Sequence, residues 1–456
     1  MSFWTLGRLA HALADELVGA APTAEAPLGR VVTDTRAIAP GDVFVALIGE
    51  RFDAHDFLET AVQEGASALV VSDAARAARL GVPLFVVPDT RSALGALGRY
   101  RRRAWGGPVV AVAGSNGKTT TKALITAALS ATLEVHATTG NLNNQVGVPL
   151  TLLAIPDEAQ VAVVEIGTNH PGEVATLRAL AEPNVAVVTS IGEEHLEGLG
   201  TLDGVLREEC AVFTDVPIAI TPAGQPEVGR MAREAMAHVV EAGTDAGDVH
   251  ADGWGVGPDG RGWFSLGDVR VTLPLLGAHN VRNAMLAVAV ARTCGVSDAA
   301  SAAGMAHMAQ LSMRSTLMSV GDLLVLHDAY NANPASAREA LAMLDALDPA
   351  RPHVAVLGSM LELGLHSDAM HEEIARRALA SSASVIAGTG EFVRAFATVA
   401  PNDTRVLTAA DAEALWPTLR SSIAPNAIIL LKGSRGARLE RLMPYLRKHA
   451  GLPETE

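Results

Sequence analysis

The residues best suited to chemistry follow an apolar run at 109–113 and include two glycines, a lysine and threonines. Glycines allow backbone N–H groups to converge on phosphate oxygens, and a helix that starts here adds partial positive charge. Lys118 can reach terminal phosphates and Thr119 can bind Mg²⁺. Val112 stands where the common motif has its first glycine, so this loop is shorter. The residues predicted to bind ATP are Gly114, Ser115, Asn116, Gly117, Lys118, Thr119 and Thr120.

A second group of reactive side chains surrounds His195, in the stretch "EEHLEGLGTLDGVLREEC". The stretch forms either a metal site or the solvated face of a loop and a helix. Charge runs are usually solvated, so from the spacing alone we expect most of its acids to face water. These acids are Glu193, Glu194, Glu197, Asp203, Glu208 and Glu209.

A third candidate is Glu165, at the end of the apolar run "VAVVE". In parallel sheets the chemistry gathers at the carboxyl ends of the strands, which places this carboxylate well for binding a metal. The alternative is an acid that simply meets water where its strand ends.

The elements that position these residues repeat a strand–loop–helix order. Runs such as "PVVAVAG", "VAVVEIG" and "NVAVVTSIG" end in glycine or polar residues, which is typical of a mostly parallel sheet. The sequence predicts an α/β fold of three domains. Residues 1–90 form the first, residues 91–309 form a central domain with a P-loop ATPase-type sheet, and residues 310–456 form a Rossmann-like domain.

Three segments outside the motifs also carry expectations. The N-terminus has Trp4, Leu6, Leu9, Leu13 and Leu17 at helical spacing, which indicates an amphipathic helix and not a signal peptide. The arginines at 101–103 are expected in a solvated connector, and the glycine-rich part at 243–275 in small antiparallel strands.

The composition excludes several classes of protein. The formal net charge is −15 over 456 residues, so binding to nucleic acid through bulk electrostatics is not expected. No apolar run reaches the roughly 18 residues that cross a membrane. Two cysteines give no disulfide framework and fit a reducing compartment, and we expect a cytoplasmic monomer.

Six motifs in order carry a resemblance to a known family: "GSNGKTTTK", "TTGNLNNQVGVPLTLL", "EIGTNHPGEV", "GAHNVRNA", "HDAYNANPAS" and "LLKGSRG". Together with "TDTR" at 33–36 they resemble the Mur ligases. "GNLNNQ", "TNHPGE" and "YNANP" point to the members that add D-alanyl-D-alanine to UDP-N-acetylmuramoyl-tripeptide. The resemblance implies an ATP- and Mg²⁺-dependent ligase of peptidoglycan precursor synthesis, which forms an acyl phosphate and anchors the UDP substrate on its first domain.

The resemblance also implies roles for single residues around ATP. It places Thr119, Glu165 and His195 at the Mg²⁺ ions and makes Lys118, Glu165 and His195 catalytic. It places Asn280 and Asn283 near the adenine, although such amides also cap helices. Arg314 and Asp328 match the pair that brings the third domain onto ATP, which makes domain closure part of the mechanism.

A further set of residues is implied on the side of the other substrates. Arg36 can pair with phosphate, but a surface salt bridge would look the same in sequence. The asparagines can donate to substrates or form turns. The predicted substrate-binding residues are Thr35, Arg36, Asn141, Asn143, Asn144, Asn331 and Asn333.

The sequence departs from the family pattern at two positions. Ser359 stands where an acid is common. Family members usually carry a lysine fourteen residues beyond the histidine that matches His195, and its carbamylated amine helps to position Mg²⁺. Glu209 stands at that position. Our hypothesis is that its carboxylate replaces the carbamate, acting through water because the side chain is shorter, and we count Glu209 among the catalytic residues.

Two other functions stay open at this point. The first is a non-catalytic or altered relative that binds nucleotide or a partner, with Glu209 and Ser359 as signs of lost chemistry. The second is a folylpolyglutamate-type ligase with another acceptor. The intact Lys118, Thr119 and His195 argue against the first, and "TNHPGE" and "YNANP" argue against the second.

Overall fold

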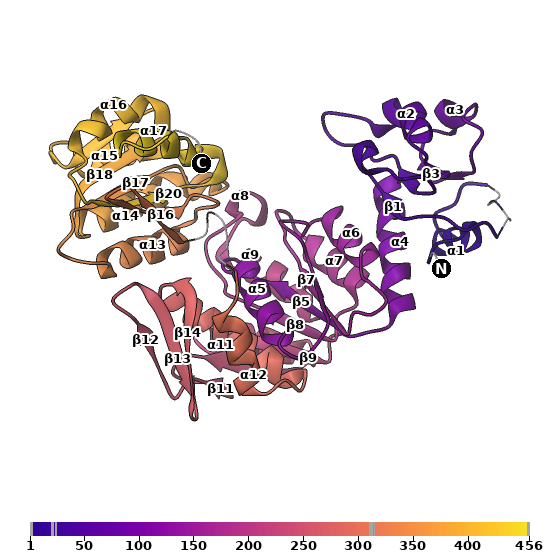
Figure 1. Ribbon diagram of the computed structural model, residues 1–456, viewed down its shortest axis with the longest axis horizontal. Coiled ribbons are helices and arrows are strands. Elements are labelled where there is room, and N and C mark those ends of the chain that lie inside the picture. The colour runs from indigo at the N-terminus through magenta and orange to yellow at the C-terminus, as the bar shows by residue number, and fades with distance from the viewer. Residues whose placement is uncertain (1–2, 20–21, 23–24, 310–312, 314, 454–456) are drawn as a thin grey trace. The chain divides into compact units, whose positions relative to one another are not determined.

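The computed structural model describes residues 3–19, 22, 25–309, 313 and 315–453 (Figure 1). It confirms an α/β protein in which most strands pair in parallel. The chain divides into two compact units. The first holds residues 1–111, 134–167 and 175–184, and the second holds 112–133, 168–174 and 185–456. The domain boundaries at 90/91 and 309/310 stay predictions.

The first unit contains a four-stranded parallel sheet in the order β1-β2-β3-β4. Successive residues of β2 point to opposite faces, so Val43 and Val45 pack in one apolar core and Phe44 in another. The strands are β1 (Val31–Val32), β2 (Val43–Val45), β3 (Ala68–Val71) and β4 (Leu84–Val86). The helices around them are α1 (Leu6–Ala12), α2 (Leu58–Gln63), α3 (Ala74–Ala77) and α4 (Thr90–Trp105).

Strands β5 to β11 form one seven-stranded sheet. In the first unit β6 and β7 are parallel, and in the second unit β8, β9, β10 and β11 follow one another in parallel. β5, β7 and β8 are buried along their whole length, as expected for parallel strands covered on both faces. The strands are β5 (Val109–Ala113), β6 (Val135–Ala137), β7 (Val161–Glu165), β8 (Val185–Val188), β9 (Ile218–Pro222), β10 (His238–Gly243) and β11 (Val249–His250). The accompanying helices are α5 (Lys118–Leu129), α6 (Gly147–Leu153), α7 (Glu173–Ala181), α8 (Leu196–Leu199), α9 (Leu202–Cys210) and α10 (Pro226–Glu234).

The expectation that the arginines at 101–103 lie in a solvated connector is wrong for Arg101 and Arg102, whereas Arg103 is exposed. Arg101 and Arg102, in the last turns of α4, are 5% and 7% exposed. Arg101 donates to the carbonyl of Ile155 at 2.5 Å, just beyond α6, and Arg102 donates to the carbonyl of Ala181 at 2.9 Å, at the end of α7. Because helix ends leave carbonyls without a partner in the helix, these guanidinium groups fasten neighbouring helices.

A three-stranded antiparallel sheet follows in the second unit, as predicted for the glycine-rich part. Its strands are β12 (Gly253–Val256), β13 (Arg261–Leu266) and β14 (Val269–Leu276). Helix α11 (Ala278–Thr293) comes next, is buried on most sides and packs against α5; α12 (Asp298–Ala306) also packs against α5. The helix that follows the phosphate loop is therefore packed against α11 and α12.

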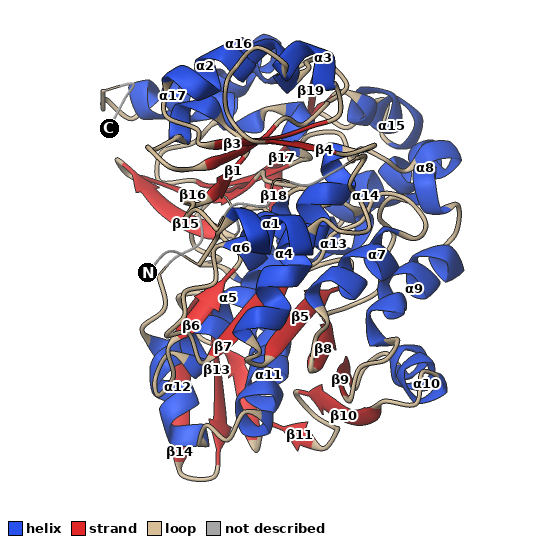
Figure 2. Ribbon diagram, turned by 90° about the vertical axis from the view of Figure 1, so that its right-hand side faces the viewer, coloured by secondary structure: helices blue, strands red, loops and turns tan. Residues whose placement is uncertain are grey.

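The C-terminal part of the second unit is built on six strands in the order β15-β16-β20-β17-β18-β19. Strands β15 to β19 are labelled in Figure 2, with helices such as α14 and α15 beside them. Only the pair β15–β16 is antiparallel, and the apolar core includes Val325, Val354 and Ile429 from adjacent strands. The strands are β15 (Thr316–Val320), β16 (Leu323–Asp328), β17 (His353–Leu357), β18 (Ala383–Thr389), β19 (Val406–Ala409) and β20 (Ile428–Lys432). The helices are α13 (Pro334–Ala346), α14 (Ser367–Leu379), α15 (Glu391–Val399), α16 (Ala412–Ser422) and α17 (Leu442–His449).

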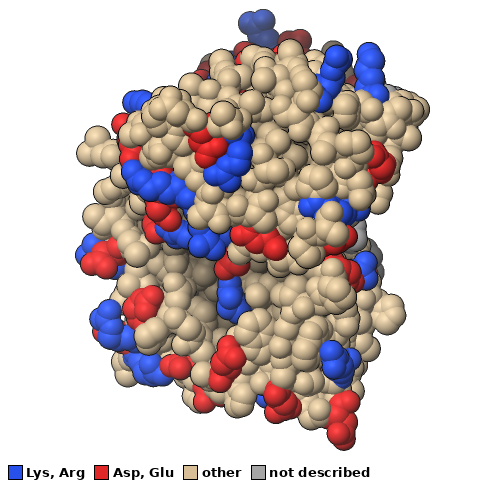
Figure 3. Space-filling model, turned by 90° about the vertical axis from the view of Figure 1, so that its left-hand side faces the viewer, with Lys and Arg blue, Asp and Glu red and all other residues tan. Residues whose placement is uncertain are grey.

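The surface drawn in Figure 3 carries charges of both signs, with Lys and Arg side chains beside Asp and Glu side chains. That face therefore presents no broad field of a single sign. Within the described part of the chain, none of the helices combines the length and apolar character needed to cross a bilayer.

Candidate active site

The phosphate loop joins β5 to α5, as the sequence predicted. Gly114 has φ 118° and Gly117, the N-cap of α5, has φ 82°, both in the region that favours glycine. A Cβ added to Gly114 would lie 2.4 Å from Oγ1 of Thr189, so no larger residue fits there. The chain turns directly from a buried strand into the start of a helix, whose first N–H groups have no partner within the helix.

The loop is fastened to the segment that follows β8. Ser115 N–H donates to the carbonyl of Ser190 at 2.7 Å, and Asn116 N–H donates to the hydroxyl of Ser190 at 3.2 Å. Gly192 N–H donates to Oγ of Ser115 at 2.9 Å. The loop amides of Ser115 and Asn116, and the N–H of Gly114, which donates to Oε2 of Glu209 at 2.7 Å, are therefore used within the protein.

Lys118 folds back over the loop that it follows. Its Nζ donates to the carbonyls of Gly114 at 2.5 Å and Ser115 at 3.3 Å, and lies 3.5 Å from Oε1 of Glu194. Glu194 is only 4% exposed. Burial raises the pKa of Glu194, and Lys118 and His195 lower it without cancelling that effect. The lysine thus stands between loop carbonyls and a buried acid.

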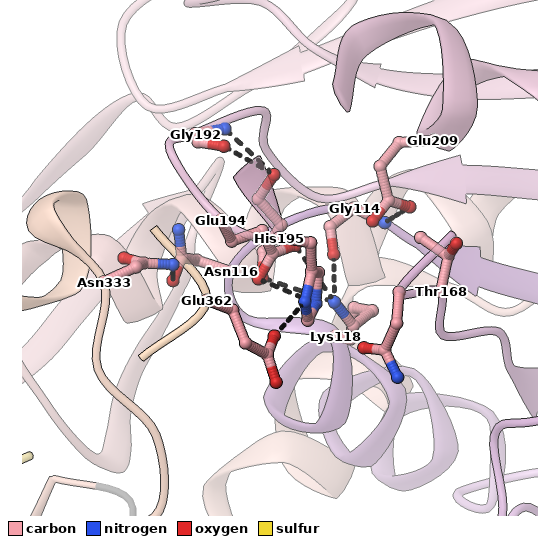
Figure 4. A network of polar contacts seen from close by, with 12 residues as sticks. Gly114, Asn116, Lys118, Thr168, Gly192, Glu194, His195, Glu209, Asn333 and Glu362 are labelled. Carbon is pink, nitrogen blue, oxygen red and sulfur yellow. Dashed lines mark hydrogen bonds and ion pairs between the residues drawn. The ribbon is translucent and has the colours of Figure 1, made fainter. Parts of the chain in front are cut away.

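Glu209 lies behind the same loop, on α9 (Figure 4). Its side chain is fully buried, and its Oε2 accepts the N–H of Gly114 at 2.7 Å. Its Oε1 has no hydrogen-bond partner among the described residues. Burial raises the pKa of Glu209 to about 7; Lys118 lowers it and Glu194 raises it further. A buried carboxylate oxygen without a hydrogen-bond donor is a ready ligand for a cation or its water.

The expectation that most acids of this stretch face water is wrong. Glu194, Glu208 and Glu209 are buried, and only Glu197 and Asp203 are exposed. Glu208 and Glu209 are buried because one side of α9 turns inward, toward the loop at 168–174 and the phosphate loop. Glu194 precedes α8 and is buried beside Lys118.

Glu208 holds that second loop, which carries the motif "TNHPGE". Its carboxylate accepts the N–H of Gly172 at 2.7 Å, the N–H of Val174 at 2.8 Å and the hydroxyl of Thr168 at 3.2 Å. Three donors on one buried acid fix the loop's backbone, so we assign Glu208 a structural role.

His195 lies between two carboxylates. Its backbone is left-handed, with φ 51°, and its side chain is 15% exposed. Nδ1 contacts the carboxylate of Glu362, and Nε2 lies 3.8 Å from Oε2 of Glu194. Burial lowers the pKa of His195, but Glu362 and Glu194 raise it, and the net effect is a rise. The ring therefore links the C-terminal sheet's loop to the neighbourhood of Lys118 (Figure 4).

Glu165 ends β7 in the first unit and is 2% exposed, so the alternative of an acid in water is wrong. Asn143 donates to its Oε1 at 2.9 Å. The side chain of Asn144 accepts the N–H groups of Val146 and Gly147, at 3.1 and 2.9 Å, and so shapes the turn into α6. Asn143 is thus placed to orient a predicted metal ligand, while Asn144 forms the turn that its residue type favours.

The other predicted substrate residues of the first unit are at the surface. Arg36 pairs with Asp34 at 2.6 Å, two residues earlier, and is 88% exposed. The hydrogen bond from Arg36 lowers the pKa of Asp34 to about 2. This is the surface salt bridge left open above, and it leaves the guanidinium face accessible. Thr35 is part-exposed and Asn141 is exposed.

The amides predicted near the adenine lie under the phosphate loop. Asn280 donates to the carbonyl of Leu276 at 2.7 Å, and Asn283 donates to Oδ1 of Asn280 at 3.1 Å. A Cβ on Gly117 would come within 2.9 Å of Oδ1 of Asn283. Asn280 and Asn283, both on α11, therefore lie against the phosphate loop. Contact of this pair with adenine stays a prediction.

The predicted residues of the third domain gather at the ends of β16 and β20. Asp328 pairs with Lys432 at 2.8 Å, and Lys432 also donates to the carbonyl of Asn331 at 2.8 Å. Arg314 lies outside the described residues. Asn333 is the N-cap of α13, where its Oδ1 accepts the N–H of Ser336 at 2.9 Å.

Asn333 also connects that helix to the phosphate loop. Its Nδ2 donates to Oδ1 of Asn116 at 2.9 Å (Figure 4). The side chain is 2% exposed and both of its polar ends are in use. The alternative left open for this motif was a turn; the structure instead shows Asn333 capping a helix, and substrate contact at Asn333 stays a prediction.

Ser359, the first departure from the family pattern, has a clear local role. Its hydroxyl accepts the N–H of Glu391, the first residue of α15, at 2.9 Å. Gly390, the N-cap, offers no side chain, so Ser359 supplies the cap from another strand end.

Replacing Ser359 with alanine is expected to lower the free energy of unfolding by about 1 kcal/mol, the usual value of an N-cap side chain. Ser359→Asp keeps an acceptor at the helix start and should be tolerated. The thermal midpoint and the amide exchange rate of Glu391 report the effect; unchanged exchange in Ser359→Ala would contradict this role.

Three residues of this arrangement were not predicted from the sequence: Glu194, Glu362 and Lys432. Each lies beside a predicted residue, contacting Lys118, His195 and Asp328 respectively. Lys432 stands within the motif "LLKGSRG" and Glu194 within the stretch "EEHLEGLGTLDGVLREEC", and those two positions were the available signals.

The donors present fit a hard divalent cation. Among the described residues no group of three or more His, Cys, Asp or Glu side chains could hold a metal by itself. Mg²⁺ usually keeps several waters and is held by one or two carboxylates together with substrate phosphates. The hydroxyl of Thr119 and the unpartnered Oε1 of Glu209 suit that mode, in which the nucleotide completes the site.

Comparison with known proteins agrees with this geometry. The model "Mur ligase family, catalytic domain" matches residues 29–102, "Mur ligase middle domain" matches 112–291, and "Mur ligase, glutamate ligase domain" matches 313–435. The chain is 36% identical to the UDP-N-acetylmuramoyl-tripeptide–D-alanyl-D-alanine ligase of Escherichia coli K12, over 98% of each chain.

Solved structures give the same result. MurF from Acinetobacter baumannii superposes with a TM-score of 0.88 at 32% identity, covering 98% of this chain and 99% of that one. The MurF ligase of Thermotoga maritima, in complex with ADP, superposes with a TM-score of 0.82 at 26% identity, covering 92% and 98%. Family models over most of the chain and a relative matched almost end to end show that the chain belongs to the Mur ligase family and is an ATP-dependent ligase.

Proposed function

We propose that this ligase joins D-alanyl-D-alanine to UDP-N-acetylmuramoyl-tripeptide at the expense of ATP. The observation that carries the proposal is the nearly end-to-end match to an enzyme of that name, combined with a complete phosphate loop. A folylpolyglutamate synthase of Mycobacterium tuberculosis shares the fold, with a TM-score of 0.62 at 21% identity, and that likeness supports the fold alone.

The proposed reaction has three steps. The terminal carboxylate of the tripeptide attacks the γ-phosphorus of ATP, forming an acyl phosphate and releasing ADP. The amine of D-alanyl-D-alanine then attacks the acyl carbon. The tetrahedral intermediate expels inorganic phosphate and loses a proton, leaving an amide.

The first step brings a carboxylate toward a triphosphate, so the site must offset the repulsion between negative charges. Lys118 supplies a positive charge at the loop, and the N–H groups at the start of α5 supply partial positive charge. Mg²⁺ bound by Thr119, Glu165 and His195 would neutralise phosphate charge. Asn143 would keep Glu165 in place through the hydrogen bond at 2.9 Å.

We infer that Glu209, in its ionised form, supplies the negative charge that a carbamylated lysine supplies elsewhere in the family. Its Oε2 is fixed by the N–H of Gly114, while its buried Oε1 has no donor among the described residues. Desolvating a carboxylate is costly, so an oxygen left without a donor suits a site completed by a cation or its water. The role needs no carbon dioxide, because the carboxylate belongs to the side chain.

Replacing Glu209 with glutamine tests this role. The amide oxygen can keep the bond from Gly114, but an NH₂ group then replaces the unpartnered oxygen. We expect the rate of phosphate release to fall roughly 10- to 100-fold, the usual effect of disturbing a metal site's support. Glu197→Gln, which changes an exposed acid of the same stretch, should leave the rate unchanged. Wild-type turnover in Glu209→Gln would overturn the role.

A second variant examines the origin of the charge. The activity of the wild-type protein should not depend on added bicarbonate. In Glu209→Lys, bicarbonate should increase turnover, because the lysine amine can then be carbamylated. Bicarbonate dependence of the wild-type enzyme would contradict the proposal for Glu209 without affecting the proposed reaction.

The proposed function itself is tested by phosphate release with ATP, UDP-N-acetylmuramoyl-tripeptide and D-alanyl-D-alanine, omitting one substrate at a time. Release that requires all three supports it. Binding of ATP without release under any combination would favour the non-catalytic alternative, and release with a folate acceptor in place of the UDP substrate would favour the other ligase.

A further inference from the structure

We propose that Glu362, on the loop after β17, is a positioning residue that orients His195 for binding of the metal–nucleotide complex. Because this loop belongs to the C-terminal sheet, the orientation of His195 in the metal site depends on the position of that sheet. The inference rests on the proposed function only in that the site takes ATP with a divalent cation. It concerns a residue that contacts neither ATP nor the tripeptide in the proposed mechanism.

Two contacts join Glu362 to the segment of His195. The side-chain carboxylate contacts Nδ1 of the ring, and the backbone carbonyl accepts the N–H of Glu197 at 3.0 Å. The side chain and the main chain of Glu362 therefore both bind the segment at the start of α8. Figure 4 shows the carboxylate directed at the ring, with Glu194 and Lys118 also close to it.

Backbone conformation marks the same two residues. His195 has φ 51° and Glu362 has φ 64°, so both backbones occupy the left-handed region, which residues other than glycine seldom adopt. Such conformations persist where the surroundings enforce them, and they gather at functional sites. Here two of them face each other across one contact, which indicates that the ring and its partner are held in a particular arrangement.

The contact decides which ring nitrogen is available. An ionised carboxylate can only accept a hydrogen bond, so Nδ1 carries the proton that points to Glu362. In the neutral ring Nε2 then keeps its lone pair. Nε2 is the nitrogen on the side of Glu194, 3.8 Å from its Oε2, and Glu194 in turn lies 3.5 Å from Nζ of Lys118. The available lone pair is therefore on the side of the phosphate loop.

This arrangement is the one by which proteins prepare histidine as a metal ligand. A carboxylate behind the ring fixes its tautomer and orientation and raises its basicity, and replacing such a carboxylate typically costs 10- to 100-fold in metal affinity or activity. The difference here is that the carboxylate comes from a separate sheet. If the loop after β17 moves away, His195 loses its orientation along with its partner.

The simpler alternative is an ion pair that only helps the C-terminal sheet to pack. The same region contains a matched example, because Arg338 of α13 lies 3.3 Å from Glu193, two residues before His195. This pair is partly exposed, and Arg338 also pairs with Glu373 at 2.8 Å, so it keeps a partner when Glu193 is replaced. Glu193 does not contact the ring in the described structure, so its replacement removes a comparable ion pair without touching His195.

The experiment measures binding of Mn²⁺ to the full-length protein in saturating ADP, from the electron paramagnetic resonance signal of the free ion. We expect Glu362→Met, which has a similar length but no acceptor, to weaken Mn²⁺ binding 10- to 100-fold. Glu362→Gln keeps an oxygen that accepts the Nδ1 proton and should restore most of the affinity. Glu193→Gln should bind Mn²⁺ within about 2-fold of the wild-type protein, because it removes an ion pair that does not involve His195.

Kinetics provide a second readout. In Glu362→Met the Mg²⁺ concentration for half-maximal rate should rise, while the KM for D-alanyl-D-alanine should stay unchanged. Equal Mn²⁺ affinity in Glu362→Met and wild type overturns the proposal, and so does an equal loss in Glu193→Gln, which would indicate packing alone. These binding results do not depend on catalysis, so they are distinct from a failure of the proposed ligase reaction.

Discussion

Lys118→Met is expected to lower the rate of ATP-dependent phosphate release roughly 10²- to 10³-fold, the usual cost of removing one preorganised group that stabilises developing charge. Methionine keeps the approximate length of the stem but removes the charge that lies over the loop carbonyls of Gly114 and Ser115. It also removes a cation that lowers the pKa of Glu194 and Glu209. The rate is measured with all three substrates at saturation.

The control is Lys448→Met, which changes an exposed lysine in the last turn of α17 and should leave the rate unchanged. Binding of ADP to Lys118→Met, followed by calorimetry, should weaken less than turnover, because the loop backbone and α5 still hold the phosphates. Turnover within 10-fold of wild type would show that Lys118 does not stabilise the transferred phosphoryl group.

Glu208→Ala should give the largest loss of stability among the acids of the stretch at 193–210. It leaves the N–H groups of Gly172 and Val174 without their acceptor. Each buried donor without a partner costs about 1–3 kcal/mol, so the loop should be destabilised by about 2–6 kcal/mol. Because a chain of several domains seldom unfolds in one step, hydrogen exchange at Gly172 and Val174 is the suitable measurement.

Two further variants serve as comparisons for the hydrogen exchange expected in Glu208→Ala. Glu208→Gln keeps one carbonyl oxygen as an acceptor and should show an intermediate increase in exchange. Glu197→Ala changes an exposed acid and should leave the exchange of both amides as in the wild type. If Glu208→Ala left the two amides protected, the carboxylate would not be what holds the loop.

The phosphate loop was predictable because its determinants are local. An apolar run, two glycines and a lysine before a helix specify β5, the left-handed turns and α5 within a few residues. The same holds for the antiparallel strands after residue 250, where glycines and alternating residues give the pattern.

The burial of the acids was not predicted because a count of charges ignores which side of a helix each one occupies. Glu209 lies four residues after Val205 and three after Leu206, so it shares their buried face of α9. That spacing was present in the sequence. Its carboxylate's partner, the N–H of Gly114, lies 95 residues away and could not be inferred from local pattern.

The asparagines show a different limit. An amide that forms a turn and an amide that binds a ligand are the same residue in a sequence. Asn144 forms a turn and Asn143 contacts Glu165, although the two are adjacent. Arg36 likewise pairs with Asp34 at the surface. Only the fold separates these uses, because the partner's position decides them.

The side chain of Asn333 limits which residues can stand at its position. Serine, threonine, aspartate and asparagine are usually interchangeable at the start of a helix, since each offers an acceptor. At this position the side chain must also donate a hydrogen bond to Oδ1 of Asn116, which lies 2.9 Å from Nδ2 of Asn333. Aspartate has no donor and the hydroxyl side chains are shorter, so asparagine alone meets both requirements. A library of all substitutions at position 333 should therefore be depleted even of the residues that helix statistics favour.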